Sequence, residues 1–107
     1  VLPEATRESD VSWFCFPLTI KDKAKFSRNE IISFLEKKNN IETRLFFSSN
    51  IVRQPAYKNT KYRVAEGLVN SDKILNDSFF FGVYPGITEE KSDFVVEKIR
   101  EFMKEHA

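Results

Sequence analysis

The sequence has very little cysteine, histidine or glycine, and each shortage excludes a class of site. One cysteine, Cys15, can form neither a disulfide within the chain nor a cysteine-based metal or iron–sulfur site. The one histidine, His106, is the penultimate residue and is more typical of a frayed tail than of a ligand or base. The three glycines, Gly67, Gly82 and Gly86, are scattered, so neither glycine-rich phosphate motif is present. We therefore expect no metal or cofactor in this chain, and no catalytic activity from the chain alone.

Long apolar runs and an excess of charge of one sign are also missing. No run approaches the roughly 20 apolar residues that span a bilayer, and no signal peptide opens the chain, which predicts a cytoplasmic protein without membrane contact. Lys and Arg number 17 against 16 Asp and Glu, for a net charge of +1, which argues against a nucleic-acid partner. The 107 residues, 41% of them hydrophobic, suit one small domain. The first residues, VLPEATRESD, lack a Met and suggest a piece of a longer protein.

The hydrophobic pattern predicts strands and helices in alternation. Residues 1–10 are polar and read as a linker, and residues 11–107 as an α/β domain. Pro17 has no N–H, so its strand should be an edge strand or contain a bulge. Ser27 and Glu30 have the spacing of a capping box at a helix start. The aromatic and β-branched runs that predict strands are 11–20, 41–47 and 78–84.

Three helices are expected between and after these strands. The first begins at the Ser27 cap and ends at Asn39-Asn40, the second is short and capped by Asn70 or Ser71, and the third is capped by Thr88. The order strand, helix, strand, short helix, strand, helix predicts a two-layer α/β sandwich with helices on one face of the sheet.

Residues 41–57, IETRLFFSSNIVRQPAY, form the best candidate site. The donors Arg44, Asn50, Arg53 and Gln54 surround a strand end and a polar loop, and they suit phosphate or sugar oxygens. The alternative is that these side chains are simply solvated.

Strand alternation assigns the side chains of this run to two faces. Ile41, Leu45 and Phe47 form the more apolar face, which should meet the helices. Arg44 should then point from the other face.

The aromatic run of Trp13, Phe14 and Phe16 has two interpretations. It could be a platform on which nucleic-acid bases stack. Its alternation with Ser12 and Cys15 favours ordinary strand packing.

Three motifs, E-T-R, N-x-x-R-Q-P-A-Y and G-V-Y-P-G, occur in this order along the chain. With the segments around them, they resemble the C-terminal region of sugar-nucleotide enzymes in the DegT/DnrJ/EryC/StrS aminotransferase family. The resemblance runs from about Leu2 to the last helix. It implies the small domain of a type I pyridoxal-phosphate enzyme, with a small, mostly antiparallel sheet of about three strands. The segments are SWFCFPLTI, FSRNEIISFLEKKNNIETRLFFSSNIVRQPAY and NSDKILNDSFFFGVYPGITEE.

The same resemblance implies a function for the parent protein. Its large domain, in the same polypeptide, would hold pyridoxamine or pyridoxal phosphate, a catalytic His in place of the usual Lys, and the cysteines of an iron–sulfur cluster. The small domain would add contacts to the sugar nucleotide, and the matching residues are Arg44, Asn50, Arg53 and Gln54. The parent is expected to be a homo-oligomer.

Within the family, the loop sequence favours one reaction over another. Aminotransferase members carry H-L-Q-P-A-Y where this chain has N-I-V-R-Q-P-A-Y. That departure favours a 3-dehydrase, which removes the C3 hydroxyl of a CDP-4-keto-6-deoxyhexose in deoxysugar and lipopolysaccharide synthesis. Two alternatives stay open: the small domain of a sugar aminotransferase, and a freestanding α/β module that binds a protein or RNA.

Overall fold

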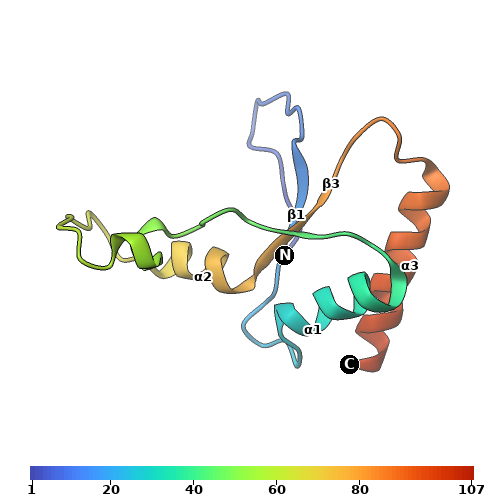
Figure 1. Cartoon of the computed structure of the whole chain (residues 1–107). Coiled ribbons are helices and arrows are strands. Elements are labelled where there is room, and N and C mark those ends of the chain that lie inside the picture. Colours follow the sequence, from blue (N-terminus) through green and yellow to red (C-terminus); the bar gives the residue numbers. More distant parts are fainter.

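A three-stranded antiparallel sheet in the order β1-β3-β2 lies at the centre of the computed structural model, which describes residues 1–107 (Figure 1). β1 pairs with β3 from Cys15–Gly82 to Thr19–Ser78, and β2 pairs with β3 through Arg44–Phe80. β1 is an edge strand, which confirms the prediction from Pro17. The strands are β1 (Cys15–Thr19), β2 (Arg44–Leu45) and β3 (Ser78–Gly82).

Three α-helices complete the predicted α/β class, and two of them begin as the sequence predicts. The Ser27 hydroxyl accepts from the backbone N–H of Glu30, whose carboxylate accepts from the Ser27 N–H at 2.7 Å, so the capping box is present. Thr88 caps the last helix by accepting from the Lys91 N–H. None of the helices has the length and apolarity needed to cross a membrane. The helices are α1 (Arg28–Ser33), continued by a π-helical turn (Phe34–Lys38), α2 (Val69–Asp77) and α3 (Glu89–Glu105).

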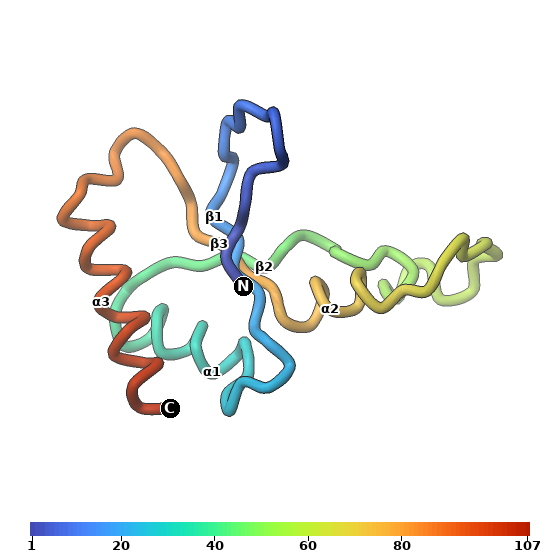
Figure 2. Tube along the Cα trace, turned by 180° about the vertical axis from the view of Figure 1, so that it is seen from behind, coloured from blue at the N-terminus to red at the C-terminus, as the bar shows by residue number.

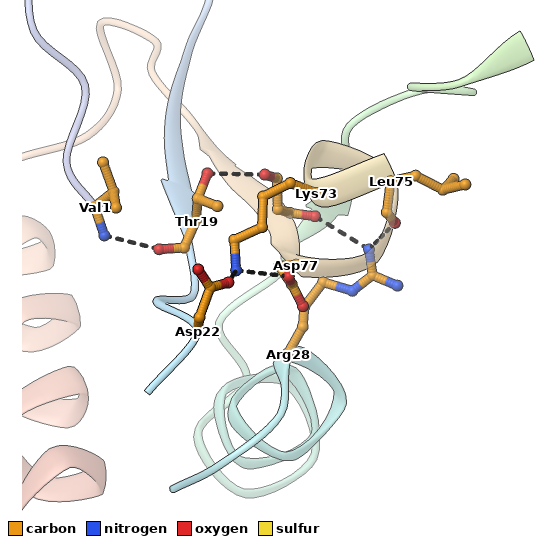
Figure 3. Close-up of polar contacts among 8 residues, drawn as sticks. Val1, Thr19, Asp22, Arg28, Lys73, Leu75 and Asp77 are labelled. Carbon is orange, nitrogen blue, oxygen red and sulfur yellow. Dashed lines mark hydrogen bonds and ion pairs between the residues drawn. The ribbon is translucent and has the colours of Figure 1, made fainter. Parts of the chain in front are cut away.

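The short helix begins earlier than predicted. Leu68 precedes its first turn, and no side chain caps it, so the predicted cap at Asn70 or Ser71 is wrong. Polar contacts join its second half to the rest of the fold (Figure 3). Lys73 pairs with Asp22 and with Asp77, and Arg28 Nη1 donates to the Leu75 carbonyl at 2.6 Å.

One face of the sheet carries the core and the other carries aromatic rings. Phe79 and Leu35 are fully buried, and α1, its π-helical turn and α3 all contribute to the same cluster as Phe79. Phe80 points to the opposite face, where the ring of Phe14 lies 6.3 Å from it. α1 and α3 therefore cover one face, as predicted, whereas α2 adds no residue to this cluster. The buried cluster is Ile31, Phe34, Leu35, Ile41, Phe79 and Phe102.

β2 is much shorter than the predicted strand 41–47. Ile41 is buried as expected, and Leu45 pairs with Phe79, so Leu45 lies on the predicted face of the sheet although its side chain is 53% exposed. Phe47 is 71% exposed, and the prediction that it faces the helices is wrong. The reason is a change in backbone conformation: Phe47 and Ser49 have φ of 48° and 44°, in the left-handed region. This turn carries the Phe47 ring to the other face of the sheet, 6.0 Å from Phe80.

Residues 46–68 form an arm that projects away from α1 and α3 (Figures 1 and 2). The arm contains two short 3₁₀ turns, η2 (Ile51–Arg53) and η3 (Pro55–Tyr57). Asn50 is its one buried residue. Both views show α2 running back along the arm to the sheet.

Candidate functional site

The predicted site residues lie in two places. Asn50, Arg53 and Gln54 lie together at the base of the arm, where two of them contact α2. Arg44 lies on β2 and has no contact with the other three.

Asp72 of α2 joins two of the arm residues. Arg53 donates from Nε to Oδ1 at 2.9 Å and from Nη2 to Oδ2 at 2.8 Å, which makes a bidentate ion pair. The Asn50 side-chain amide donates to the same Oδ1 at 2.7 Å. Asn50 is 4% exposed, so this hydrogen bond satisfies an amide that is out of contact with water. We call Asn50, Arg53 and Asp72 the Asp72 clamp.

The electrostatics of the clamp keep both partners charged. Hydrogen bonds from Arg53 lower the pKa of Asp72, while partial desolvation opposes this shift and the Asn50 amide adds to it. The hydrogen bonds and the charge of Asp72 raise the pKa of Arg53. The pair is therefore ionised throughout the neutral range.

Gln54 stabilises the shape of the loop rather than the clamp. It lies between the two 3₁₀ turns, and its side-chain amide donates to the Ser48 carbonyl at 3.1 Å. This bond closes the stretch from Ser48 to Gln54, which contains both arm residues of the clamp.

Arg44 belongs to a separate, open cleft of about 350 Å³, which Phe81, Tyr84 and Lys91 also line. Its Nη2 lies 2.6 Å from Glu42 Oε1, and both side chains are more than two thirds exposed, at 71% and 74%. Such an exposed pair leaves most of the guanidinium free for a ligand.

The sequence reasoning missed Asp72, although a signal for it exists. No Asp or Glu occurs between Glu42 and Glu66, so Arg53 has no acidic neighbour in the arm sequence. A carboxylate in the first turn of the following helix was the available partner, and it is favourable there because of the helix dipole. The cations in this stretch are Arg44, Arg53, Lys58, Lys61 and Arg63.

The Asp72 clamp contains no lysine that could form a Schiff base with pyridoxal phosphate. No group of three or more His, Cys, Asp or Glu side chains is arranged to hold a metal ion.

A hydrophobic groove of about 460 Å³ lies beside α3, and Phe26, Ile99 and Met103 are among the residues that line it.

Comparison with known proteins identifies two relatives that are 50% identical to this chain. The chain is 50% identical over 101 residues to the lipopolysaccharide biosynthesis protein RfbH of Salmonella typhimurium, covering 94% of this chain and 23% of that protein. It is also 50% identical over 103 residues to dTDP-4-dehydro-2,6-dideoxy-D-glucose 3-dehydratase of Saccharopolyspora spinosa, covering 96% of this chain and 22% of that enzyme. The chain therefore spans about a quarter of the length of these relatives.

A solved structure shares the fold. Crystallised GDP-4-keto-6-deoxymannose-3-dehydratase, with a trapped PLP-glutamate geminal diamine, matches with a TM-score of 0.70 and 20% identity, over 92% of this chain and 25% of that one. The sequence profile of the DegT/DnrJ/EryC1/StrS aminotransferase family matches residues 1–100. Because this match covers nearly the whole chain, the chain belongs to the DegT/DnrJ/EryC1/StrS aminotransferase family.

Proposed function

We propose that this chain is the C-terminal small domain of a sugar-nucleotide 3-dehydrase, with residues 1–10 as the linker from a large domain and 11–107 as the folded unit. The observation that carries the proposal is 50% identity over nearly the whole chain to a named sugar 3-dehydratase. The equal identity to RfbH supports a role in lipopolysaccharide synthesis. The reaction of the parent would be C3 deoxygenation of a CDP-4-keto-6-deoxyhexose.

In this proposal the arm supplies contacts to the nucleotide part of the substrate. Arg53 carries a positive charge at the base of the arm, and its side chain is 53% exposed. Gln54 would offer its amide group to sugar or phosphate oxygens. Asn50 is 4% exposed and its amide donates to Asp72, so it would serve the substrate site by supporting the loop. Arg44 would make a second, separate contact from its cleft on β2.

The cofactor would come from elsewhere in the polypeptide. The large domain would hold pyridoxamine or pyridoxal phosphate, which would supply the electron sink for loss of the C3 hydroxyl. It would also hold the iron–sulfur cluster that the resemblance implies. The parent would act in the cytoplasm as a homo-oligomer, with a complete site only when the two domains are together.

The test uses the full-length parent enzyme, loaded with pyridoxamine phosphate and supplied with CDP-4-keto-6-deoxy-D-glucose. Loss of the C3 hydroxyl, followed by mass spectrometry and NMR, is the expected result. Formation of an amino sugar with glutamate as donor would instead identify an aminotransferase. If the enzyme neither removes the C3 hydroxyl nor transfers an amino group, a binding module would be favoured.

The contribution of the arm is tested in the same enzyme. Arg53→Ala should raise KM for the sugar nucleotide about tenfold, the loss expected for a charge-assisted hydrogen bond. The matched control is Arg100→Ala, an exposed arginine on α3 with no ion pair, which should leave KM unchanged. An unchanged KM in Arg53→Ala would remove Arg53 from the substrate site.

A further inference from the structure

α2 connects the arm to the rest of the fold through neighbouring residues. In the middle of the helix, Lys73 bonds to Asp22 in the loop after β1, and nearer the C-terminal end Arg28 of α1 donates to the Leu75 carbonyl (Figure 3). In its first turn, Asp72 faces the arm and accepts from Asn50 and Arg53. The helix therefore holds the arm through Asp72, while Lys73 and Leu75 fix it to the loop after β1 and to α1.

Asp72 is the hydrogen-bonding partner that holds the Arg53 side chain. Neither 3₁₀ turn contains a buried residue, and Tyr62 of the arm acts on the pKa of Arg53 only through its charge. Each side-chain hydrogen bond of Arg53 ends on Asp72. Because an arginine side chain has several rotatable bonds, removing the carboxylate would let Arg53 sample many orientations.

The bidentate pair leaves one edge of the guanidinium free. Asp72 occupies the Nε–H and one N–H of Nη2. The N–H groups of Nη1 and the second N–H of Nη2 make no hydrogen bond within the chain, and together they form a second fork of the kind that binds phosphate or carboxylate. With 53% of the side chain exposed, this fork can reach a ligand.

We propose that Asp72 is a positioning residue, which orients Arg53 so that its free fork binds a phosphate group of the sugar nucleotide. This inference rests on the proposed function. Asp72 does not touch the ligand, since its two oxygens are already used by Arg53 and Asn50. It would act on affinity and not on the chemical step, because in the proposed function the reacting groups belong to the large domain.

The experiment measures KM and kcat of the full-length enzyme with CDP-4-keto-6-deoxy-D-glucose, and the Kd of CDP by calorimetry. Asp72→Asn keeps the size of the side chain but removes its charge and one strong acceptor. We expect KM and the Kd of CDP to rise roughly tenfold with kcat unchanged. Asp72→Glu, which keeps the carboxylate, should recover part of the loss.

The matched control is Asp77→Asn, on the same helix. Asp77 pairs with Lys73 at 2.8 Å and has no contact with the arm, so KM and Kd should stay at wild-type values. An equal rise in this variant would mean that any damage to α2 weakens binding, and it would overturn a specific role for Asp72.

A double variant separates positioning from a general structural effect. If Asp72 acts through Arg53, adding Asp72→Asn to Arg53→Ala should raise KM no further. A further rise of the same size as in the single variant would overturn the inference. Wild-type binding in Asp72→Asn beside a raised KM in Arg53→Ala would overturn it while the proposed function stands. Wild-type KM in Arg53→Ala would remove the proposed role of Arg53 and this inference with it.

Discussion

The sheet with α1 and α3, which we call the body, differs from the arm in what holds it together. A cluster of six buried apolar residues spans the sheet and both helices of the body. The arm has a single buried residue, Asn50, and is joined to α2 by charge-assisted hydrogen bonds to Asp72. Apolar packing involves many residues at once, so the body keeps its shape when one surface group changes. The arm depends on a few polar groups, so the loss of one of them should change its shape more than a single surface change alters the body.

The largest predicted effect is in the body. Phe79→Ala should lower the free energy of unfolding by about 3–5 kcal/mol, because the fully buried ring fills the centre of the cluster and the cavity would be lined by β3, α1 and α3. Denaturant melts followed by circular dichroism measure this change.

The arm provides the matched control for this change. Ile51→Ala removes an apolar side chain that is 54% exposed, and it should change the free energy of unfolding by about 0.5 kcal/mol or less. A loss in Ile51→Ala as large as in Phe79→Ala would show that the arm is part of the core and would remove the distinction between the two regions.

The body is also the part that the sequence predicts well. Ser27, Glu30 and Thr88 mark helix starts that the structure confirms, and Asn40 ends the first helix with φ of 54°. Pro17 correctly predicts an edge strand. These signals are local, since a cap or an edge residue acts through hydrogen bonds within a few positions of itself.

The arm was harder to predict because its structure comes from non-local contacts. Nothing in the run Ile41–Phe47 indicates that β2 stops at Leu45, because the left-handed turn at Phe47 puts an aromatic residue where glycine is usual. No feature of the sequence predicted the π-helical turn after α1 either. The pairing of Arg53 with Asp72 spans 19 positions, beyond the reach of any periodicity.

A smaller effect in the body tests the first helix start. Ser27→Ala should cost about 1 kcal/mol by removing the N-cap acceptor. Glu30→Ala should cost less, and the double variant should cost less than the sum, because the two side chains share one capping box. Strict additivity in denaturant melts would contradict a shared box.

Acid should act on the arm through Asp72. Its pKa in the folded chain is below the ordinary value of 3.8, so the clamp stabilises the fold above pH 3.8 and loses this contribution as pH falls below that value. Thermal melts of the wild type and of Asp72→Asn should therefore differ most at neutral pH and converge in acid. A difference that stays constant from pH 7 to pH 3 would show that the charge of Asp72 does not stabilise the fold.

The smallest predicted effect on stability concerns Arg44, which belongs to neither the core nor the Asp72 clamp. Its ion pair with Glu42 is largely exposed, and such pairs contribute at most about 1 kcal/mol, so Arg44→Ala should leave the melting curve almost unchanged. In the full-length enzyme the same change should raise KM for CDP-4-keto-6-deoxy-D-glucose about tenfold, and Arg44→Lys should recover little if the contact is bidentate.

A double variant tests whether the two arginines act independently. Since Arg44 and Arg53 share no partner, the logarithms of their KM changes should add in the double variant. A double variant no worse than either single one would mean that both arginines bind the same group. A wild-type KM in Arg44→Ala would remove Arg44 from the proposed substrate site, which would then consist of Asn50, Arg53 and Gln54.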